Sequence, residues 1–184
     1  ADFDIIELGS LVTDLDIPYD LNTSWVTGPN YTGYGNAYTA GHTGKLTSVS
    51  MHKSGYCQMQ GGFSPTLKIY QGAVTADSYG IVGNPTLLYQ KTFSNSYWNS
   101  SNSVVGSFGI QSGWFTMEIP IDQAPTLNAG TQYSIVMTGS SCNQFKANKD
   151  PANTAVNYIG VNASQWALNN YVLWMKTTML VDPP

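Results

Sequence analysis

Short segments in which apolar and polar side chains alternate constrain the fold of this chain more than any other feature. Residues 46–51 (Leu-Thr-Ser-Val-Ser-Met), 66–70 (Thr-Leu-Lys-Ile-Tyr) and 132–137 (Gln-Tyr-Ser-Ile-Val-Met) are clear examples. A period of two is typical of a β-strand with one buried face, and the Gly, Pro and Asn residues between such segments favour turns. Further strands are expected at residues 3–8, 88–93, 114–119, 156–159 and 172–180.

The number and spacing of these segments predict a β-sandwich. Roughly eight to ten short strands joined by turns are typical of two packed antiparallel sheets. The chain has 184 residues, a length that suits one domain, and its 18 Gly and 9 Pro supply the turns. We therefore expect a single all-β domain over residues 1–184, a two-sheet antiparallel β-sandwich of the jelly-roll type.

The low charge of the chain argues against two classes of partner. Only 10% of the residues are charged, the net charge is −4, and all seven basic residues are lysines. Nucleic acids attract clusters of cations, and arginine is the usual bidentate contact to phosphate. No run of apolar residues approaches the length of about 18 that would span a bilayer. We therefore expect neither nucleic-acid binding nor membrane insertion.

The two cysteines, Cys57 and Cys142, point to an oxidising compartment. In a chain rich in Ser, Thr and Asn and poor in charge, such a pair favours one disulfide. We therefore expect a secreted, extracellular protein located at the cell surface. Two separate buried thiols are the alternative, and no Cys-x-x-Cys pattern suggests a metal or redox pair.

Four segments, taken in order, are similar to a known kind of module. They are residues 37–49 (Ala-Tyr-Thr-Ala-Gly-His-Thr-Gly-Lys-Leu-Thr-Ser-Val), 66–72 (Thr-Leu-Lys-Ile-Tyr-Gln-Gly), 112–116 (Ser-Gly-Trp-Phe-Thr) and 127–136 (Leu-Asn-Ala-Gly-Thr-Gln-Tyr-Ser-Ile-Val). Their order and spacing resemble those of secreted jelly-roll modules of bacterial surface proteins. The resemblance implies a sandwich whose first and last strands pair in one sheet, a secreted location and an accessory or adhesive role. It implies no particular ligand.

Residues that could support catalysis are scarce. His42 and His52 are the only histidines, and neither begins a His-Glu-x-x-His motif. No Gly-x-Ser-x-Gly elbow occurs. Glu118 and Asp122 could form a carboxylate pair for glycoside hydrolysis, but the sequence shows nothing that would separate their roles. We therefore expect a protein that is not an enzyme.

Acidic residues gather near the start of the sequence. Asp14, Asp16 and Asp20 could offer oxygen ligands to a structural Ca²⁺ ion, which takes six to eight of them. The EF-hand pattern is absent. The alternative is a solvated acidic edge that discourages pairing between sheets of different molecules.

Aromatic residues outside the expected strands are candidates for ligand binding. A sugar ring has an apolar C–H face that an aromatic ring can cover, and neutral polar groups can pair with its hydroxyls. The candidates are Tyr97, Trp98, Tyr31, Tyr34 and Trp166. The alternative is that these rings pack against the sandwich and anchor the loops to it. The aromatic residues in strand patterns are expected in the core: Trp114, Tyr133, Trp174 and Tyr70.

Two functions remain. The first is a carbohydrate-binding or adhesive module whose partner is a glycan or another cell-surface ligand. The alternative is a structural subunit of an extracellular fibre or surface assembly, which would bind copies of itself by strand exchange or edge pairing. That alternative predicts that residues 1–20 or the last strand leave their own domain.

Overall fold

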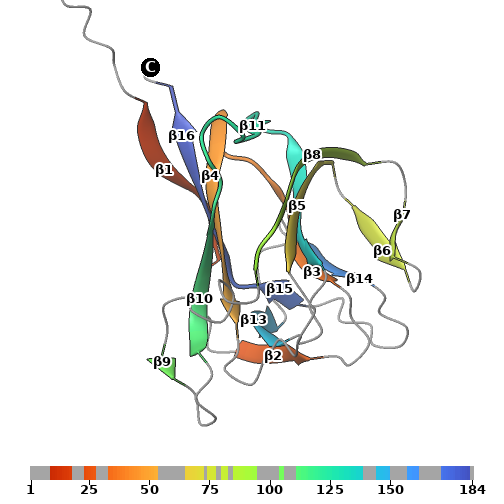
Figure 1. The fold of residues 1–184 in the computed structure, drawn as a ribbon. Coiled ribbons are helices and arrows are strands. Elements are labelled where there is room, and N and C mark those ends of the chain that lie inside the picture. Colours follow the sequence, from red (N-terminus) through yellow and green to blue (C-terminus); the bar gives the residue numbers. More distant parts are fainter. Residues whose placement is uncertain are drawn as a thin grey trace, which may run out of the picture.

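Two antiparallel sheets face each other in this protein (Figure 1). The predicted all-β sandwich is therefore confirmed. In the part of the chain that the computed structural model describes, no helix is long and apolar enough to cross a membrane. The described residues are 9–17, 23–27, 33–53, 65–72, 74–77, 80–82, 85–94, 104–105, 111–138, 144–149, 157–161 and 171–182.

The larger sheet contains the first and last described strands. Its main path runs in the order β1 (Ser10–Asp16), β16 (Met175–Val181), β4 (Gly44–Lys53), β10 (Gln111–Glu118) and β9 (Val104–Val105). Off this path, the sheet adds β11 (Thr126–Leu127), β13 (Gln144–Lys149), β2 (Thr23–Thr27) and β15 (Tyr171–Leu173). β1, which the sequence did not predict, pairs with β16 at one end of this path. The strand predicted at residues 3–8, for which the resemblance implied pairing with the last strand, lies outside the described residues.

The smaller sheet is formed by five strands in the order β14 (Asn157–Val161), β3 (Gly33–Thr39), β12 (Gln132–Thr138), β5 (Thr66–Gln71) and β8 (Thr86–Thr92). A separate hairpin, β6 (Thr75–Asp77) and β7 (Gly80–Val82), lies in the connection between β5 and β8. The described strands thus include the segments predicted at residues 46–51, 66–70, 88–93, 114–119, 132–137 and 156–159, with differences of a few residues at their ends. The single strand predicted at residues 172–180 is instead two strands, because the chain leaves β15, which pairs with β13, and enters β16, which pairs with β4.

The core lies between the sheets and is built from every second residue of each strand. Phe115 and Met117 on β10 and Met175 and Met179 on β16 are fully buried. Opposite them, β5 and β12 bury Leu67, Ile69, Ile135 and Met137. Each such side chain contributes about 1.5–3 kcal/mol when it leaves water, so this alternation largely determines the fold. The core positions predicted for Tyr133 and Trp174 are confirmed. Tyr70 is buried in a separate apolar cluster, and Trp114 is only partly buried.

The glycine-rich stretch around residue 35 is a strand and not a loop. A Cβ atom on Gly35 would overlap the backbone of Ile135 on the neighbouring strand β12, so only glycine allows β3 and β12 to approach this closely. Next to it, Asn36 is fully buried between the sheets. Its side-chain amide donates to the carbonyl of Leu173 (2.9 Å) and accepts from the Leu173 N–H (3.1 Å). The two sheets are therefore joined by a fully paired polar contact as well as by apolar packing.

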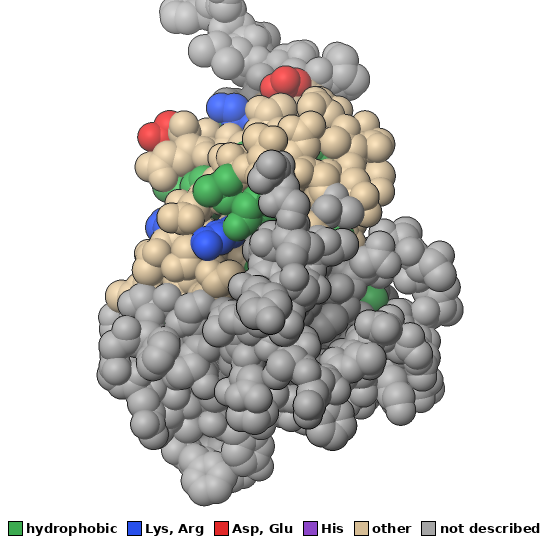
Figure 2. All heavy atoms as spheres, turned by 90° about the vertical axis from the view of Figure 1, so that its right-hand side faces the viewer, with side chains coloured by type: hydrophobic (Ala, Val, Ile, Leu, Met, Phe, Trp, Pro, Cys, Tyr) green, Lys and Arg blue, Asp and Glu red, His purple; other side chains and the backbone are tan. Residues whose placement is uncertain are grey.

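The connection between β5 and β8 covers the outer face of the smaller sheet. Val74 packs on Tyr70, Ala37 and Val136, which form a second apolar cluster outside the main core. The hydroxyl of Ser134 donates to the carbonyl of Gly72 (2.8 Å) and accepts from the Val74 N–H (2.9 Å). Figure 2, seen from the right-hand side of Figure 1 where β8, β6 and β7 lie, shows few charged side chains among the described atoms.

Candidate functional site

The outer face of the larger sheet presents side chains in rows that the strand register sets. On β4, the residues His52, Ser50 and Ser48 pair with Trp114, Thr116 and Glu118 of β10. On the other side, Lys176 and Thr178 of β16 pair with Ser50 and Ser48 of β4. Directly paired residues share a face of the sheet, and alternate residues along a strand share it as well. The rows therefore form one continuous surface, which we call the outer platform.

An aromatic row forms one end of the outer platform. The rings of Trp114 and Trp174 stack with centroids 6.2 Å apart at 24°. The His52 ring meets both edge-on, at 5.5 Å from Trp114 and 5.2 Å from Trp174. Trp174 is 7% exposed, whereas Trp114 and His52 are partly exposed. Trp114 is therefore the largest ring of this row that can contact a ligand, and Trp174 and His52 hold it in place.

A polar row follows directly. The hydroxyls of Ser50 and Thr116 hydrogen-bond to each other at 2.8 Å. Lys176 Nζ lies 3.6 Å from Asp16 Oδ1 and 4.9 Å from the centroid of the Trp114 ring. The side chains of Lys176 and Asp16 are 44% and 50% exposed, so both still meet solvent. The row thus offers donors and acceptors beside the aromatic ring.

A third row continues with Thr178, Ser48 and the exposed carboxylate of Glu118. Glu118 lies on β10 and Asp16 on β1, three strand spacings apart, so the backbones of these two acidic residues are separated by about 14 Å across the sheet. The outer platform therefore has an acidic residue toward each side, with hydroxyl groups between them.

The site predicted from loop aromatics does not coincide with the outer platform. Tyr34 lies on strand β3 and is fully buried between the sheets, so its predicted loop position is wrong. Glycines around Tyr34 are typical of a loop, but here Gly35 is required by the close approach of strand β12. The other four candidates, Tyr31, Tyr97, Trp98 and Trp166, lie outside the described residues, as do Cys57 and Cys142. Ligand binding by those four rings and the disulfide remain predictions.

A signal for the outer platform was present in the sequence. Residues 114–118 read Trp-Phe-Thr-Met-Glu and residues 174–178 read Trp-Met-Lys-Thr-Thr. Both segments begin with Trp and then place a polar residue at every second position, with apolar or small residues between. A strand pattern of this kind predicts an outward face that starts with an aromatic ring.

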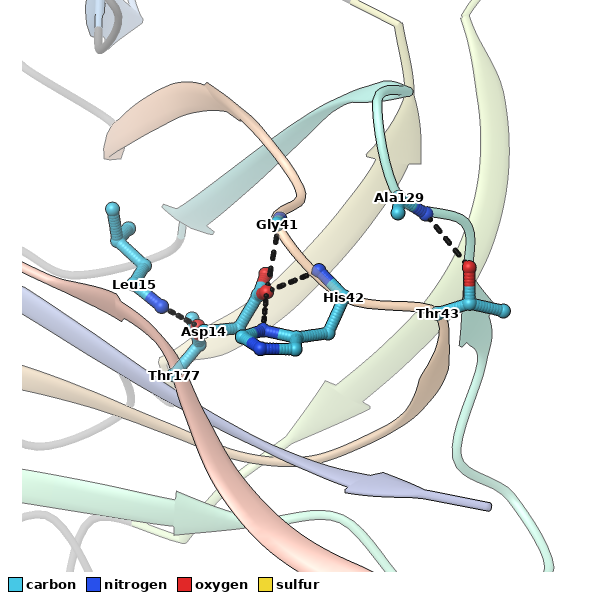
Figure 3. Close-up of polar contacts among 7 residues, drawn as sticks. All are labelled: Asp14, Leu15, Gly41, His42, Thr43, Ala129 and Thr177. Atoms are coloured by element: carbon cyan, nitrogen blue, oxygen red, sulfur yellow. Dashed lines mark hydrogen bonds and ion pairs between the residues drawn. The ribbon is translucent and has the colours of Figure 1, made fainter. Parts of the chain in front are cut away.

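The predicted calcium ligands are engaged in two separate places. Asp14 is the extra residue of a β-bulge in β1, and its side chain is completely buried. Its Oδ1 atom accepts from the backbone N–H groups of Gly41 (2.9 Å) and His42 (2.8 Å) and lies 2.9 Å from His42 Nδ1 (Figure 3). Asp16 instead pairs with Lys176 on the outer platform. These two carboxylates therefore do not converge on one ion, and Asp20 lies outside the described residues.

The cluster around Asp14 is a structural clamp. The buried hydroxyl of Thr177 accepts from the Leu15 N–H at 2.9 Å, which fixes the bulge on β16. Burial, followed by the negative charge of Asp14, raises the pKa of the Tyr38 phenol. Between the sheets, Asp14 thus joins β1 to the turn that links β3 and β4.

Two of the sequence segments quoted above meet at this turn. The Ala129 N–H donates to the hydroxyl of Thr43 at 3.0 Å (Figure 3), and the Gly130 N–H donates to the carbonyl of Ala40 at 2.8 Å. Gly130 has a φ of 77°, a backbone conformation that glycine adopts without strain. Residues 40–43 and 129–130 thus hold the top of the sandwich together, so their role is structural.

No family model matches the chain, and no curated protein is similar to it in sequence. Among solved structures, the chain is similar to the crystal structure of the cysteine protease and lectin-like domains of Cwp84, a surface-layer-associated protein of Clostridium difficile. The TM-score is 0.46 at 11% identity, over 89% of this chain and 37% of that one. A second structure of Cwp84, a clostridial cysteine protease after propeptide cleavage, gives 0.45 at 10% identity, over 89% and 41%. Similarity at this level says nothing about what the present chain binds.

Proposed function

We propose that this chain is a non-catalytic extracellular binding module that holds carbohydrate on the outer platform of its larger sheet. One observation carries the proposal: a partly exposed Trp114, held by His52 and Trp174, lies beside a row of hydroxyl and charged groups on the same sheet face. The ring can cover the apolar side of a sugar, while the neighbouring row pairs with its hydroxyls.

The rigidity of the outer platform supports this function. Sugars are well hydrated and bind proteins weakly, so their binding provides little free energy for ordering side chains. Each side chain that has to be immobilised costs about 0.5–1.5 kcal/mol. Trp114 is already fixed by two ring contacts, and the Ser50 and Thr116 hydroxyls already hold each other. The outer platform is therefore largely preorganised before a ligand arrives.

Pull-down and isothermal titration calorimetry with a panel of polysaccharides test the proposal. We expect saturable binding by the intact chain and its loss in Trp114→Ala, with the fold of the variant checked by circular dichroism. Each arm is repeated in EDTA, because the calcium prediction would make binding depend on the ion. Binding that persists unchanged in Trp114→Ala would place the ligand elsewhere, and no binding by the folded chain would remove the proposal.

The fibre subunit remains a second candidate because of β1. This strand lies at one end of the main path of the larger sheet, and its Leu11 side chain is 68% exposed. An open edge with an exposed apolar residue can pair with another chain. The last strand β16 lies between β1 and β4, so β1 is the better donor. Analytical ultracentrifugation distinguishes the candidates: edge pairing gives concentration-dependent assemblies that Leu11→Lys abolishes.

A further inference from the structure

We infer that the ligand of the outer platform is an uncharged polysaccharide, recognised along its chain and not at a charged group. The inference rests on the proposed function and adds the class of ligand. It follows from three properties of the outer platform: how its charges are paired, which groups its central ion pair can contact, and how far it extends.

The described charges on and beside the outer platform give an acidic ligand no net attraction. The lysines whose side chains the structure describes here are Lys176, on the outer platform, and Lys45, beyond its third row. Lys176 is shared between the Asp16 carboxylate and the Trp114 ring. Lys45 donates to the carbonyl of Ile121 at 3.2 Å. Asp16 and Glu118 carry as many negative charges as these two lysines carry positive ones, so a uronate, sulfate or phosphate would gain no net attraction here.

The ion pair of Asp16 and Lys176 is suited to hydroxyl groups. Both side chains are about half exposed, so each keeps hydrogen-bonding capacity toward solvent. The carboxylate accepts from one hydroxyl, and the ammonium donates to a neighbouring one. Neighbouring hydroxyls on a neutral sugar ring match this donor and acceptor without separating the two charges. An anionic sugar would have to compete with Asp16 for Lys176.

The extent of the outer platform favours a chain of sugars over a single terminal ring. Three rows cover about 14 Å along the strands, and the four strands from β1 to β10 cover about 14 Å across them. Both dimensions exceed one sugar ring. A sugar stacked on Trp114 therefore leaves the polar rows for the next units of the same chain.

The test compares neutral cello-oligosaccharides with oligogalacturonates of equal length, titrated into the intact chain at low salt and in 0.5 M NaCl. We expect the neutral hexasaccharide to bind at least tenfold more tightly than the acidic one and more tightly than the neutral disaccharide. Salt should change the neutral affinity by less than about twofold, because no charge is recognised. Equal or tighter binding of the oligogalacturonate, weakened by salt, would overturn the inference; if Trp114→Ala abolished that binding, the proposed function would still stand.

Asp16→Asn sharpens the test because it releases Lys176. We expect the affinity for oligogalacturonate to rise several-fold and that for the neutral hexasaccharide to fall. Asp122→Asn is the matched control, since it removes the same charge from an exposed turn beyond the end of β10, outside the three rows of the outer platform. If both variants raise the acidic affinity equally, overall charge and not the ion pair decides the ligand, and the inference is wrong. If neither class of glycan binds the intact chain, the proposed function fails together with the inference.

Discussion

The two sheets of this sandwich treat their outer faces in opposite ways. On the smaller sheet, the outward positions Ala37, Tyr70 and Val136 are apolar, and the chain covers them with Val74 from its own β5–β8 connection. On the larger sheet, the outward positions of β4, β10 and β16 are mostly Ser, Thr and charged residues beside one aromatic row. Most of these residues are partly exposed to solvent. The residue types at outward positions therefore distinguish a face that the protein covers with its own chain from one whose side chains remain partly exposed.

The same hydrogen-bonding group illustrates the difference. Ser134 on the smaller sheet is completely buried, and its hydroxyl both donates to and accepts from the backbone of the covering segment. Ser50 on the larger sheet pairs with Thr116 near the surface. The Ser134 hydroxyl therefore stabilises the protein, whereas the Ser50 hydroxyl lies on the face that we propose binds the ligand.

The largest effect should come from placing a charge on each face. Val136→Asp would bury an unpaired carboxylate under Val74, and we expect a loss of about 3–5 kcal/mol in the free energy of unfolding. Thr178→Asp, on the outer platform, should change it by less than about 1 kcal/mol. Urea denaturation followed by tryptophan fluorescence measures both. Similar losses in the two variants would show that the faces do not differ as described.

A second comparison concerns the ligand. Trp114→Ala should weaken carbohydrate binding at least tenfold, about 1.4 kcal/mol, because the largest partly exposed ring of the aromatic row is lost. Lys68→Ala, on the outer face of the smaller sheet, should leave the affinity unchanged. Calorimetry on folded protein gives both values. A loss in Lys68→Ala as large as in Trp114→Ala would move the site to the smaller sheet.

The two serines provide a third and smaller contrast. Ser134→Ala removes two hydrogen bonds and leaves the buried Val74 N–H without its acceptor, so we expect a loss of about 1–3 kcal/mol. Ser50→Ala should lower stability by less than about 1 kcal/mol. Thermal unfolding of the two variants, measured under the same conditions, compares their losses of stability. The account would be contradicted if Ser50→Ala were the more destabilising change.

The smallest effect concerns Tyr70, whose pKa is raised by burial. The unfolded chain therefore loses this phenol proton at lower pH than the folded chain does. The contribution of this phenol to the free energy of unfolding is fully present below the ordinary tyrosine pKa of about 10, and it is lost as the pH rises above that value. Val74→Ala, which uncovers Tyr70, should move its titration back toward the ordinary value, as followed by phenolate absorbance with Tyr70→Phe as the reference. A titration unchanged by Val74→Ala would mean that the covering segment does not bury the phenol.

Much of the fold was predictable because alternation is a local property. Segments such as 66–70 and 132–137 carry their buried face in their own sequence, and the structure places them in adjacent strands β5 and β12. The strand β3 was missed because its glycines are required by a neighbouring strand, β12, which local sequence does not show. The bulge at Asp14 was missed for a similar reason, since its partners are Gly41 and His42 on a distant turn.

The candidate site was harder to predict because it needs the strand register. Trp114 was expected in the core, and only the pairing of β10 with β4 shows that it shares an outer face with His52, whose ring also contacts Trp174. A search for aromatics in loops could not find this row. The repeated pattern of Trp followed by alternate polar residues would have suggested it, but not which strands lie side by side.

The most direct test of the account is to map the ligand onto the isotope-labelled protein by NMR. Adding the neutral hexasaccharide should shift the indole N–H signal of Trp114 and the amide signals around Thr116, Ser50 and Lys176, while signals of Ala37, Ser134 and Val136 stay in place. Shifts confined to the smaller sheet, or no shift at saturating ligand, would contradict the claim that the outer platform of the larger sheet binds carbohydrate.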